Sequence, residues 1–321
     1  MTHDSYDSPW KQVMDHFFEP AVAFFFPKIH EAVDWSCDVE AMDTDLEQVL
    51  QDAKFGQMRV DKLVKVRMKT GKTRYLYIHI EVQNQKEPRF ARRVFHYYFR
   101  LVEKYEHHVT TCVILGDENP NWRPDEFSEN LLGTAITFRY PTMKLWDYLE
   151  EWEELEANSN PFALVVMTHL KSKKTRKNPG KRLQEKLYLW KEMRRRGYSK
   201  ENTLNLMRFI GWVMAMPEPY EKQFWVETKK MEPGQEAESM WYIEKVLIEK
   251  GKKEGLREGI REGEKSGEKK EAKNMLYKLI AKKFGSVPRW VEEKIGTAEI
   301  EQLRTWVMQA PFADHLDETF S

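Results

Sequence analysis

Cysteine is almost absent from this chain, because only Cys37 and Cys112 occur among 321 residues. Two cysteines cannot build a disulfide framework or a structural zinc site of the four-ligand kind, so we expect a reducing compartment. An excess of either charge is also missing, since 52 basic residues balance 52 acidic ones. The overall charge therefore does not draw the protein toward nucleic acid or a membrane, and any such attraction must come from a local patch.

Long hydrophobic runs are missing as well. The most apolar stretch, residues 21–27, is far shorter than the about 20 residues that span a bilayer. The first residues include early acidic positions and do not lead from a basic segment into an apolar run, so they predict no secretion signal. We expect a soluble, cytoplasmic protein with no membrane partner. The chain does have 13% aromatic residues, which can supply a substantial buried core.

The first half of the chain alternates between helix and strand patterns. Residues 74–83 alternate polar and aliphatic positions, as strands do, whereas residues 89–106 repeat apolar positions at helical spacing without Pro or Gly. Thr70, Gly71 and Lys72 predict a turn between two paired strands. The predicted elements are a helix at 8–18, strands at 55–66 and 74–83, a helix at 89–106, and buried strands at 109–115 and 134–140.

The second half of the chain has mainly helical patterns. Gly recurs every four residues from Gly251 to Gly267, which predicts a marginal, charged helix or a flexible tether. Amphipathic helices follow, with predicted breaks at residues 285–288 and at Gly296. We divide the chain into a core at 1–157, a helical subdomain with a basic segment at 158–240, a Gly-repeat helix or linker at 241–269, and a small helical domain at 270–321.

The most informative residues are Asp61, Glu81 and Gln83, which lie on the two strands that flank Gly71. If the turn is centred on Gly71, residues whose numbers sum to 142 face each other, and Asp61 lies opposite Glu81. Their Cβ atoms would then be about 4.5 to 5.5 Å apart. A register one residue different would instead place Asp61 opposite Ile80.

Two carboxylates at this distance repel each other, so one must raise its pKa or a cation must lie between them. Oxygen ligands suit Mg²⁺ or Mn²⁺, which can stabilise a phosphoryl transition state and lower the pKa of a bound water. This chemistry favours phosphodiester hydrolysis. The alternative is that both carboxylates lie on the solvated face of an antiparallel hairpin, and spacing alone does not decide between the two.

The order of the motifs resembles a known family. RVDKLVKV, YIHIEVQNQ, a helix with Arg93, Tyr97 and Arg100, and then VTTCVILGDE follow one another along the chain. This order is similar to the Rpn family of recombination-promoting nucleases, also called transposase-like proteins, in the PD-(D/E)XK nuclease superfamily. The resemblance covers about residues 5–150. The helices after about residue 270 are similar to a small domain often attached to these proteins.

The resemblance implies a fold and a set of site residues. The fold is a PD-(D/E)XK restriction-endonuclease-like α/β core, a mixed sheet flanked by helices, with a helical C-terminal extension. Asp61 and Glu81 would bind Mg²⁺ or Mn²⁺, and Asp7 would approach the metal, with simple helix capping by Asp7 as the alternative. Gln83 stands where the superfamily pattern has lysine. It cannot supply positive charge but can orient the attacking water, so we expect slow turnover.

Basic residues provide two sets of candidate contacts with DNA. Arg93 and Arg100, seven residues apart, share a helix face, and the resemblance implies that one or more of the arginines contacts substrate phosphate. The alternative is an outward helix face that pairs with Glu103 and Glu106. Between residues 171 and 200, 13 residues are basic and two acidic, which is dense enough to neutralise several phosphates. The alternative is a solvated run matched by the acidic residues 147–156. The candidates in this run are Lys173, Lys174, Arg176, Lys177, Arg194 and Arg195.

The sequence and the resemblance together predict a metal-dependent DNA endonuclease with a role in recombination. One alternative is a relative of the same fold that binds nucleic acid or a protein partner without cutting, and it predicts DNA binding with no metal-stimulated turnover. Another is a helical scaffold, a homo-oligomer assembled through the Gly repeat and the C-terminal helices. It predicts oligomers that disappear when residues 245–321 are deleted.

Overall fold

The computed structural model divides the chain into two compact units, residues 1–240 and residues 241–321. The predicted boundary at residue 157 falls inside the first unit. The described residues are 7–42, 61–69, 75–231, 271–298, 300–313 and 315–320, without the side chains at positions 7, 8, 61, 293, 297 and 301. The Gly repeat at 251–267 and the predicted turn at 70–72 therefore lie outside the described residues.

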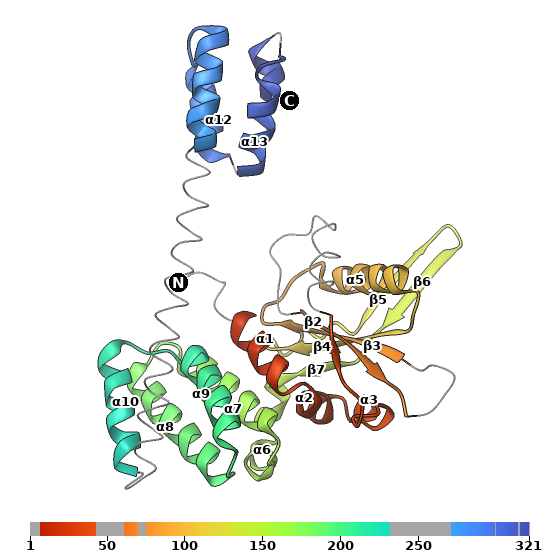
Figure 1. The fold of residues 1–321 in the computed structure, drawn as a ribbon, viewed down its shortest axis with the longest axis vertical. Helices are drawn as coiled ribbons and strands as arrows, with labels where there is room; N and C mark the ends of the chain where they lie inside the picture. The colour runs from red at the N-terminus through yellow and green to blue at the C-terminus, as the bar shows by residue number, and fades with distance from the viewer. Residues whose placement is uncertain are drawn as a thin grey trace. The chain divides into compact units, whose positions relative to one another are not determined.

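The first unit contains a mixed five-stranded sheet with the order β1-β2-β3-β4-β7. The central strand β3 (Tyr75–Gln83) is antiparallel to β2 (Asp61–Arg67) and parallel to β4 (Val109–Leu115). The edge strands are β1 (Glu40–Ala41), antiparallel to β2, and β7 (Thr142–Lys144), parallel to β4. Helices flank this sheet, so the protein has a mixed α/β architecture (Figure 1).

One face of the sheet is covered by α5 (Phe90–Tyr105). This helix forms because Phe90, Val94, Tyr97 and Leu101 recur at helical spacing, and all four are buried. Tyr97 and Leu101 pack on the β2–β3 pair in one apolar cluster. The helix ends at Glu106, whose left-handed backbone conformation (φ 51°) closes the last turn.

The other face of the sheet is aliphatic and meets α1 (Asp7–His16), which is followed along the chain by α2 (Phe18–Phe25) and α3 (Pro27–Ala32). Ile78, Ile80 and Val82 of β3 are buried there, as their alternation predicts. Lys62 is in register with Ile80 and its Nζ donates to Asp15 Oδ1 of α1 at 2.8 Å. Lys62 is buried and Asp15 is exposed, so this partly buried ion pair holds α1 over the aliphatic face.

Helix α7 (Pro161–Lys174) joins the helical part of the first unit to the sheet. Its residues 162–170 are buried without interruption, as expected for a helix that is apolar on all sides. His169 Nε2 donates to the Gly116 carbonyl oxygen at 2.8 Å, just after β4. Gly116 has no room for a side chain, because a Cβ there would lie 2.2 Å from Asn84 Oδ1 and 2.9 Å from His169 Cε1. The C-terminal ends of β3 and β4 are therefore packed tightly against α7.

The predicted strand at 134–140 forms, but it is not a buried strand of the main sheet. β6 (Thr134–Arg139) pairs only with β5 (Glu126–Leu131), in a separate antiparallel hairpin, and most of its side chains are exposed. Only the base of the hairpin is covered, where the ring of Phe127 stacks on Phe95 of α5 at 4.8 Å. We call residues 126–139 the β5–β6 arm. Burial was predicted wrongly because alternation identifies a strand but not whether a second layer covers it.

Helices follow in the remaining parts of both units. After η2 (Leu145–Leu149), the first unit continues with α6 (Trp152–Ala157), α7, α8 (Pro179–Arg195), α9 (Lys200–Val213) and α10 (Glu218–Met231). In the second unit, residues 271–284 are helical and are followed by α12 (Arg289–Thr297), α13 (Ile300–Gln309) and η3 (Leu316–Phe320). The predicted break at 285–288 is present. Among the described helices, none has the length and apolar character needed to cross a membrane.

Candidate active site

Glu81 lies on the central strand β3, on the face that α5 covers. The β2–β3 register pairs Asp61 with Glu81, which confirms the predicted alignment. Residues directly opposite each other in an antiparallel pair share a sheet face, so position 61 is on this face too. The side chain of Glu81 is fully buried. The solvated-hairpin alternative is therefore wrong for Glu81, and a buried carboxylate needs a cation or hydrogen bonds around it.

Arg93 of α5 supplies such a cation. Its Nη2 donates to Glu81 Oε1 at 2.6 Å and to Gln83 Oε1 at 3.1 Å. Its Nη1 lies 2.9 Å from Glu87 Oε2. Arg93 is buried, so the outward-facing alternative is also wrong for this residue. The predicted contact of Arg93 with substrate phosphate would need the guanidinium to leave this position.

The surroundings of Arg93 keep it charged. Burial opposes the positive charge, but the attraction of Glu81, Tyr97 and Glu87 outweighs it and raises the pKa of Arg93. The guanidinium carbon also lies 5.2 Å from the ring centre of Phe90 and 5.9 Å from that of Tyr97. These rings enclose the cation from the helix side. The charge of Glu81 is thus balanced inside the protein by a fixed, permanently ionised partner.

Gln83 and His79 complete the polar face of β3. The Gln83 amide is engaged at both ends, because its Oε1 accepts from Arg93 and its Nε2 donates to the Gln85 carbonyl oxygen at 2.6 Å. Its predicted role in orienting water stays a prediction. Burial, together with the nearby Arg93, lowers the pKa of His79 to about 3, so this imidazole is neutral at neutral pH. It cannot serve as a protonated acid there.

The oxygen atoms around Arg93 form the donor set that a hard divalent cation prefers. A carboxylate and an amide oxygen converge on the single nitrogen Nη2, and the position of Asp61 faces Glu81 across the strand pair. In the part of the chain that the structure describes, no cluster of three or more His, Cys, Asp or Glu side chains could hold a metal ion. The side chains of Asp61 and Asp7 lie outside that part. The metal site remains a prediction whose available donors fit Mg²⁺.

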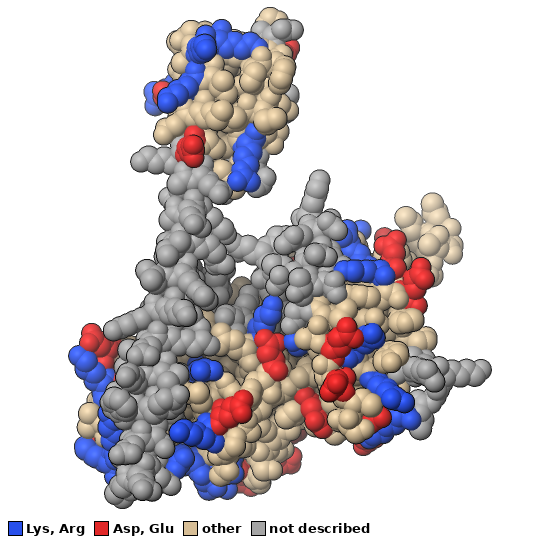
Figure 2. All heavy atoms as spheres, in the orientation of Figure 1, with Lys and Arg blue, Asp and Glu red and all other residues tan. Residues whose placement is uncertain are grey.

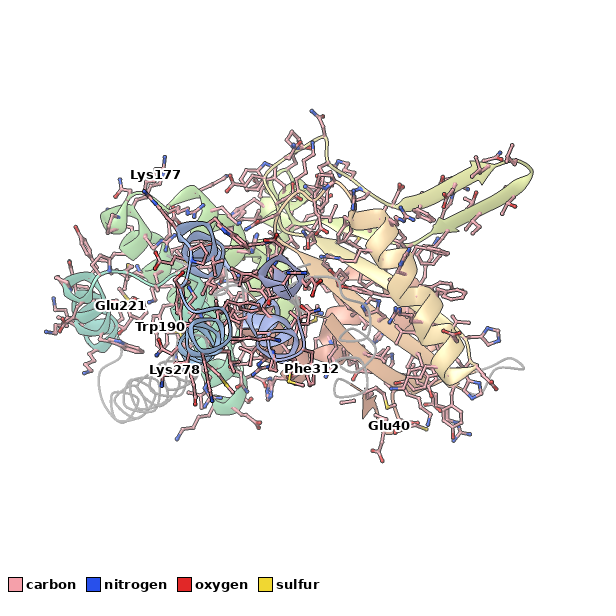
Figure 3. All side chains as sticks on the ribbon, turned by 90° about the horizontal axis from the view of Figure 1, so that it is seen from above. Glu40, Lys177, Trp190, Glu221, Lys278 and Phe312 are labelled. Carbon is pink, nitrogen blue, oxygen red and sulfur yellow. The ribbon has the colours of Figure 1, made fainter. Side chains whose placement is uncertain are left out.

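The basic run between residues 171 and 200 does not form one surface. Asn178 caps α8 and Pro179 is its first residue, so the chain reverses there and α8 runs back along α7. Lys174, Arg176 and Lys177 are exposed at this turn, and Figure 3 shows Lys177 extending outward. We call these three residues the loop cluster. Arg194 lies at the opposite end of α8, which is roughly 25 Å long at 1.5 Å per residue.

Part of the basic run is used in internal contacts. Lys186 is buried and pairs with both carboxylate oxygens of Glu221 at 2.8 and 2.9 Å. Arg195 Nη2 donates to the Glu156 carbonyl oxygen at 2.5 Å. At this end the acidic segment contacts the basic run through a backbone carbonyl, so the alternative of a run matched by acidic side chains stays a prediction. On the face seen in Figure 2, Lys and Arg side chains lie among Asp and Glu side chains.

Lys173 places the loop cluster near the strand ends. It follows His169 by one helical turn, and His169 is bonded to Gly116 after β4. Burial lowers the pKa of Lys173, although the carboxylates of Glu118 and Asp117 oppose this effect. Lys173 is therefore half-buried and close to the loop that follows β4. The loop cluster begins directly after it.

One ion pair at the strand ends was not identified from the sequence. Lys144 of β7 and Asp117 are both buried, with Lys144 Nζ 2.5 Å from Asp117 Oδ2. The sheet register places Gln83, Leu115 and Lys144 in one row across β3, β4 and β7. The signal was available in part, because a charged residue two positions after an apolar strand, as Asp117 is after β4, must find a partner when the strand end is buried.

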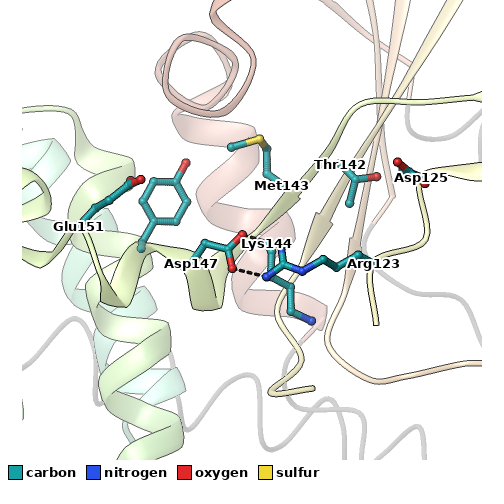
Figure 4. Close-up of a pocket in the computed structure, with 8 residues that line it drawn as sticks. Arg123, Asp125, Thr142, Met143, Lys144, Asp147 and Glu151 are labelled. Carbon is teal, nitrogen blue, oxygen red and sulfur yellow. Dashed lines mark hydrogen bonds and ion pairs between the residues drawn. The ribbon is translucent and has the colours of Figure 1, made fainter. Parts of the chain in front are cut away.

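A cavity of about 330 Å³ lies at the β7 edge of the sheet (Figure 4). Its lining includes Arg123 and Asp147. The Arg123 guanidinium donates two hydrogen bonds to the Asp147 carboxylate, of 2.5 and 2.6 Å. The hydrogen bonds from Arg123 lower the pKa of Asp147. None of the residues predicted for the active site lines this cavity. It is therefore a separate polar pocket.

The fold and the site define a class of protein. It is a mixed α/β protein whose central strand carries a buried carboxylate, with a second acidic position opposite it on the antiparallel neighbour. Residues 3–115 match the model of the family described as "Putative transposase, YhgA-like", which is of the Rpn, PD-(D/E)XK type. The resemblance is confirmed for this segment, which runs to the end of β4. No curated protein and no solved structure matches the chain.

Proposed function

We propose that the protein is a Mg²⁺-dependent DNA endonuclease with a PD-(D/E)XK core. The observation that supports this most is the register that sets Asp61 opposite the buried Glu81, inside the segment that matches a transposase-like family. Burying a carboxylate is a poor way to gain stability, and buried charges with close partners are concentrated at functional sites. The reaction would be hydrolysis of a phosphodiester bond, with a role in recombination or transposition.

Arg93 has a specific part in this proposal. Gln83 stands where the superfamily pattern has a lysine, and Arg93 bonds to both Gln83 and Glu81. The positive charge that Gln83 lacks is therefore present on α5, within hydrogen-bond distance of the same carboxylate. Bound Mg²⁺ would add charge stabilisation for the phosphoryl transition state. The protein's own contribution is a guanidinium that is held in place by Glu87 on its other side.

The loop cluster is the part of the basic run best placed to hold DNA. Lys174, Arg176 and Lys177 are exposed and follow Lys173, which is close to the loop after β4. The candidate carboxylate lies two residues before the end of the neighbouring strand β3. Arg194 and Arg195 lie at the far end of α8 and would contact only a longer or bent substrate. Contacts of DNA with Arg100, which is half-buried on α5, belong to the same proposal.

The first test is cleavage of supercoiled plasmid. We expect the wild-type protein to nick plasmid with Mg²⁺ and to leave it intact with EDTA. The Asp61→Ala variant should nick no faster than buffer alone, because one of the two acidic metal ligands is gone. Glu153→Ala, which removes an exposed carboxylate of α6, is the matched control and should keep the wild-type rate. Wild-type nicking by Asp61→Ala would refute the metal site.

A second test compares the loop cluster with Arg194 and Arg195 through the salt dependence of DNA binding, measured without metal. Replacing all three residues of the loop cluster by Ala should lower the slope of log K against log salt by about 2 to 3, near one unit per lost phosphate contact. The matched variant Arg194→Ala/Arg195→Ala should change the slope much less. A larger drop in slope for Arg194→Ala/Arg195→Ala than for the loop-cluster variant would mean that DNA binds at the other end of α8.

DNA binding without cleavage is the second candidate function. The Arg93–Glu81 pair favours it, because the buried carboxylate already has a cation and does not need a metal for charge balance. This candidate predicts the same salt-sensitive binding, with intact plasmid in both Mg²⁺ and Mn²⁺. The plasmid assay therefore decides between the two functions, and the binding assay does not.

A further inference from the structure

Exposed apolar side chains gather on the β5–β6 arm and the adjoining part of α5. Leu131 is 65% exposed, Leu132 98%, Ile136 39% and Phe99 57%. Figure 1 shows the arm projecting beyond α5 and the sheet. An apolar surface of this kind, continuous over two elements, is unusual for a face that meets only water.

The arm has one apolar face and one polar face. The strand register pairs Phe127 with Phe138 and Glu129 with Ile136, and Leu131 follows on the same face. The rings of Phe127 and Phe138 rest on α5, where Phe95 and Tyr98 contact them. Beyond these rings, α5 no longer covers the face. The apolar face thus continues outward from a packed base to an exposed tip.

The turn of the arm is built at a conformational cost. Leu132 and Gly133 both have positive φ, 48° and 89°, as a tight two-residue hairpin turn requires. Asn or Gly normally occupies the first of these positions, because a side chain with a large Cβ group is strained there. Here a leucine holds it, almost completely exposed. Neither folding of the hairpin nor solubility accounts for this residue, whereas a contact with another apolar surface does.

Charge identifies the occupant. Within the arm, Glu126 pairs with Arg139 at 2.5 Å, so Glu129 gives the arm its net negative charge. A negative charge disfavours nucleic acid and anionic lipid. The side of α5 that carries Phe99 is basic on balance, because exposed Arg92 and half-buried Arg100 outnumber the exposed Glu103 there. Burial and then the charges of Arg92 and Arg100 lower the pKa of His96, so both arginines act on this face. One chain therefore presents an apolar acidic arm next to an apolar basic helix face.

We propose that this surface binds a second copy of the chain in a two-fold dimer. The arm of each copy lies over the Phe99 face of α5 in the other, so that Glu129 of one meets Arg92 of its partner. Such a contact is self-complementary, because each copy offers both the acidic arm and the basic helix face. The dimer places Leu131 and Leu132 of one copy against Phe99 of the other. The face of α5 that packs on its own sheet stays undisturbed.

Sedimentation equilibrium of the full chain over a concentration series tests the dimer. We expect a wild-type dimer, and a dissociation constant raised about tenfold or more by Leu131→Ser/Leu132→Ser, since exposed apolar anchors carry most of the binding. Val226→Ser is the matched control, because Val226 is 51% exposed on α10 of the same unit. It should leave the dissociation constant unchanged. A wild-type monomer at every concentration, or a dimer indifferent to the arm, would overturn the proposal.

A charge exchange tests the pairing itself. Glu129→Arg and Arg92→Glu should each weaken the dimer, and the variant with both changes should restore it, because the opposite charges meet again across the interface. Weakening without restoration overturns the two-fold arrangement. Both residues are exposed, so circular dichroism and thermal unfolding should match the wild type. An assembly that needs only the C-terminal helices would survive all of these changes and would also count against the proposal.

Discussion

The Glu81→Gln variant is expected to lose Mg²⁺-dependent nicking by on the order of a hundredfold to a thousandfold. Glutamine has the shape of glutamate and can still accept from Arg93, which lies 2.6 Å from Glu81 Oε1. It carries no charge, however, and so it cannot take part in binding a divalent cation as a carboxylate does. Arg93 keeps Glu87 as a charged partner, so the fold should be retained. Initial nicking rates over a range of Mg²⁺ concentrations measure the loss.

Glu87→Gln is the matched control for that result. It removes the other carboxylate that contacts Arg93, at 2.9 Å, but leaves Glu81 and the position of Asp61 intact. We expect its nicking rate to fall less than tenfold, because Glu87 holds the guanidinium without binding the proposed metal. Equal losses in the two variants would mean that the ion-pair network, and not a metal ligand, limits the rate. A Glu81→Gln variant as fast as the wild type would exclude Glu81 as a ligand.

The strand pair at the site could be predicted from the sequence because two local rules agree. The alternation along residues 74–83 assigns each residue to a face, and a turn predicted at Gly71 gives the same register as the observed pairing of Asp61 with Glu81. Both rules act over short distances along the chain. The partner of Glu81 needed a long-range contact and was not predicted.

Arg93 nevertheless left a signal in the sequence. It lies three residues after Phe90 and four before Tyr97, on the same stripe of α5 that packs on the sheet. An arginine in an apolar stripe must find a carboxylate on the surface opposite, and Glu81 is the acidic residue on the polar face of β3. Grouping Arg93 with Arg100 by their spacing of seven hid this relation, because the two residues differ in burial.

The basic run shows the opposite limit of sequence reasoning. The number of basic residues in this run was counted correctly. Basic residues that are close along the chain are not all close on the surface, however, because the chain reverses within the run. Asn178 and Pro179 mark the reversal, since they are a typical cap and first residue of a helix. They separate Lys174 from Arg194 by the length of α8. Which basic residues were used internally could not be inferred, because their partners, such as Glu221 for Lys186, come from other helices.

The Arg93→Met variant is expected to show the largest change in stability. Methionine fills much of the space but leaves the fully buried Glu81 without its cation, and breaking a buried ion pair in this way costs about 3 to 5 kcal/mol. Urea unfolding at neutral pH without metal measures the difference. The paired variant Glu81→Leu/Arg93→Met removes both charges and should be far less destabilised than Arg93→Met alone, which isolates the pair from the loss of packing.

Mg²⁺ then distinguishes a structural ion pair from a metal site. If Glu81 binds the metal, Mg²⁺ takes over the charge balance that Arg93 provided, and it should stabilise Arg93→Met more than the wild type. A metal concentration of 100 times the dissociation constant would add about 2.7 kcal/mol to the free energy of unfolding. The same addition should have no effect on Glu81→Leu/Arg93→Met, which has lost the carboxylate. Equal stabilisation of all three proteins would place any bound Mg²⁺ elsewhere, and Arg93 would then be the only cation that Glu81 requires.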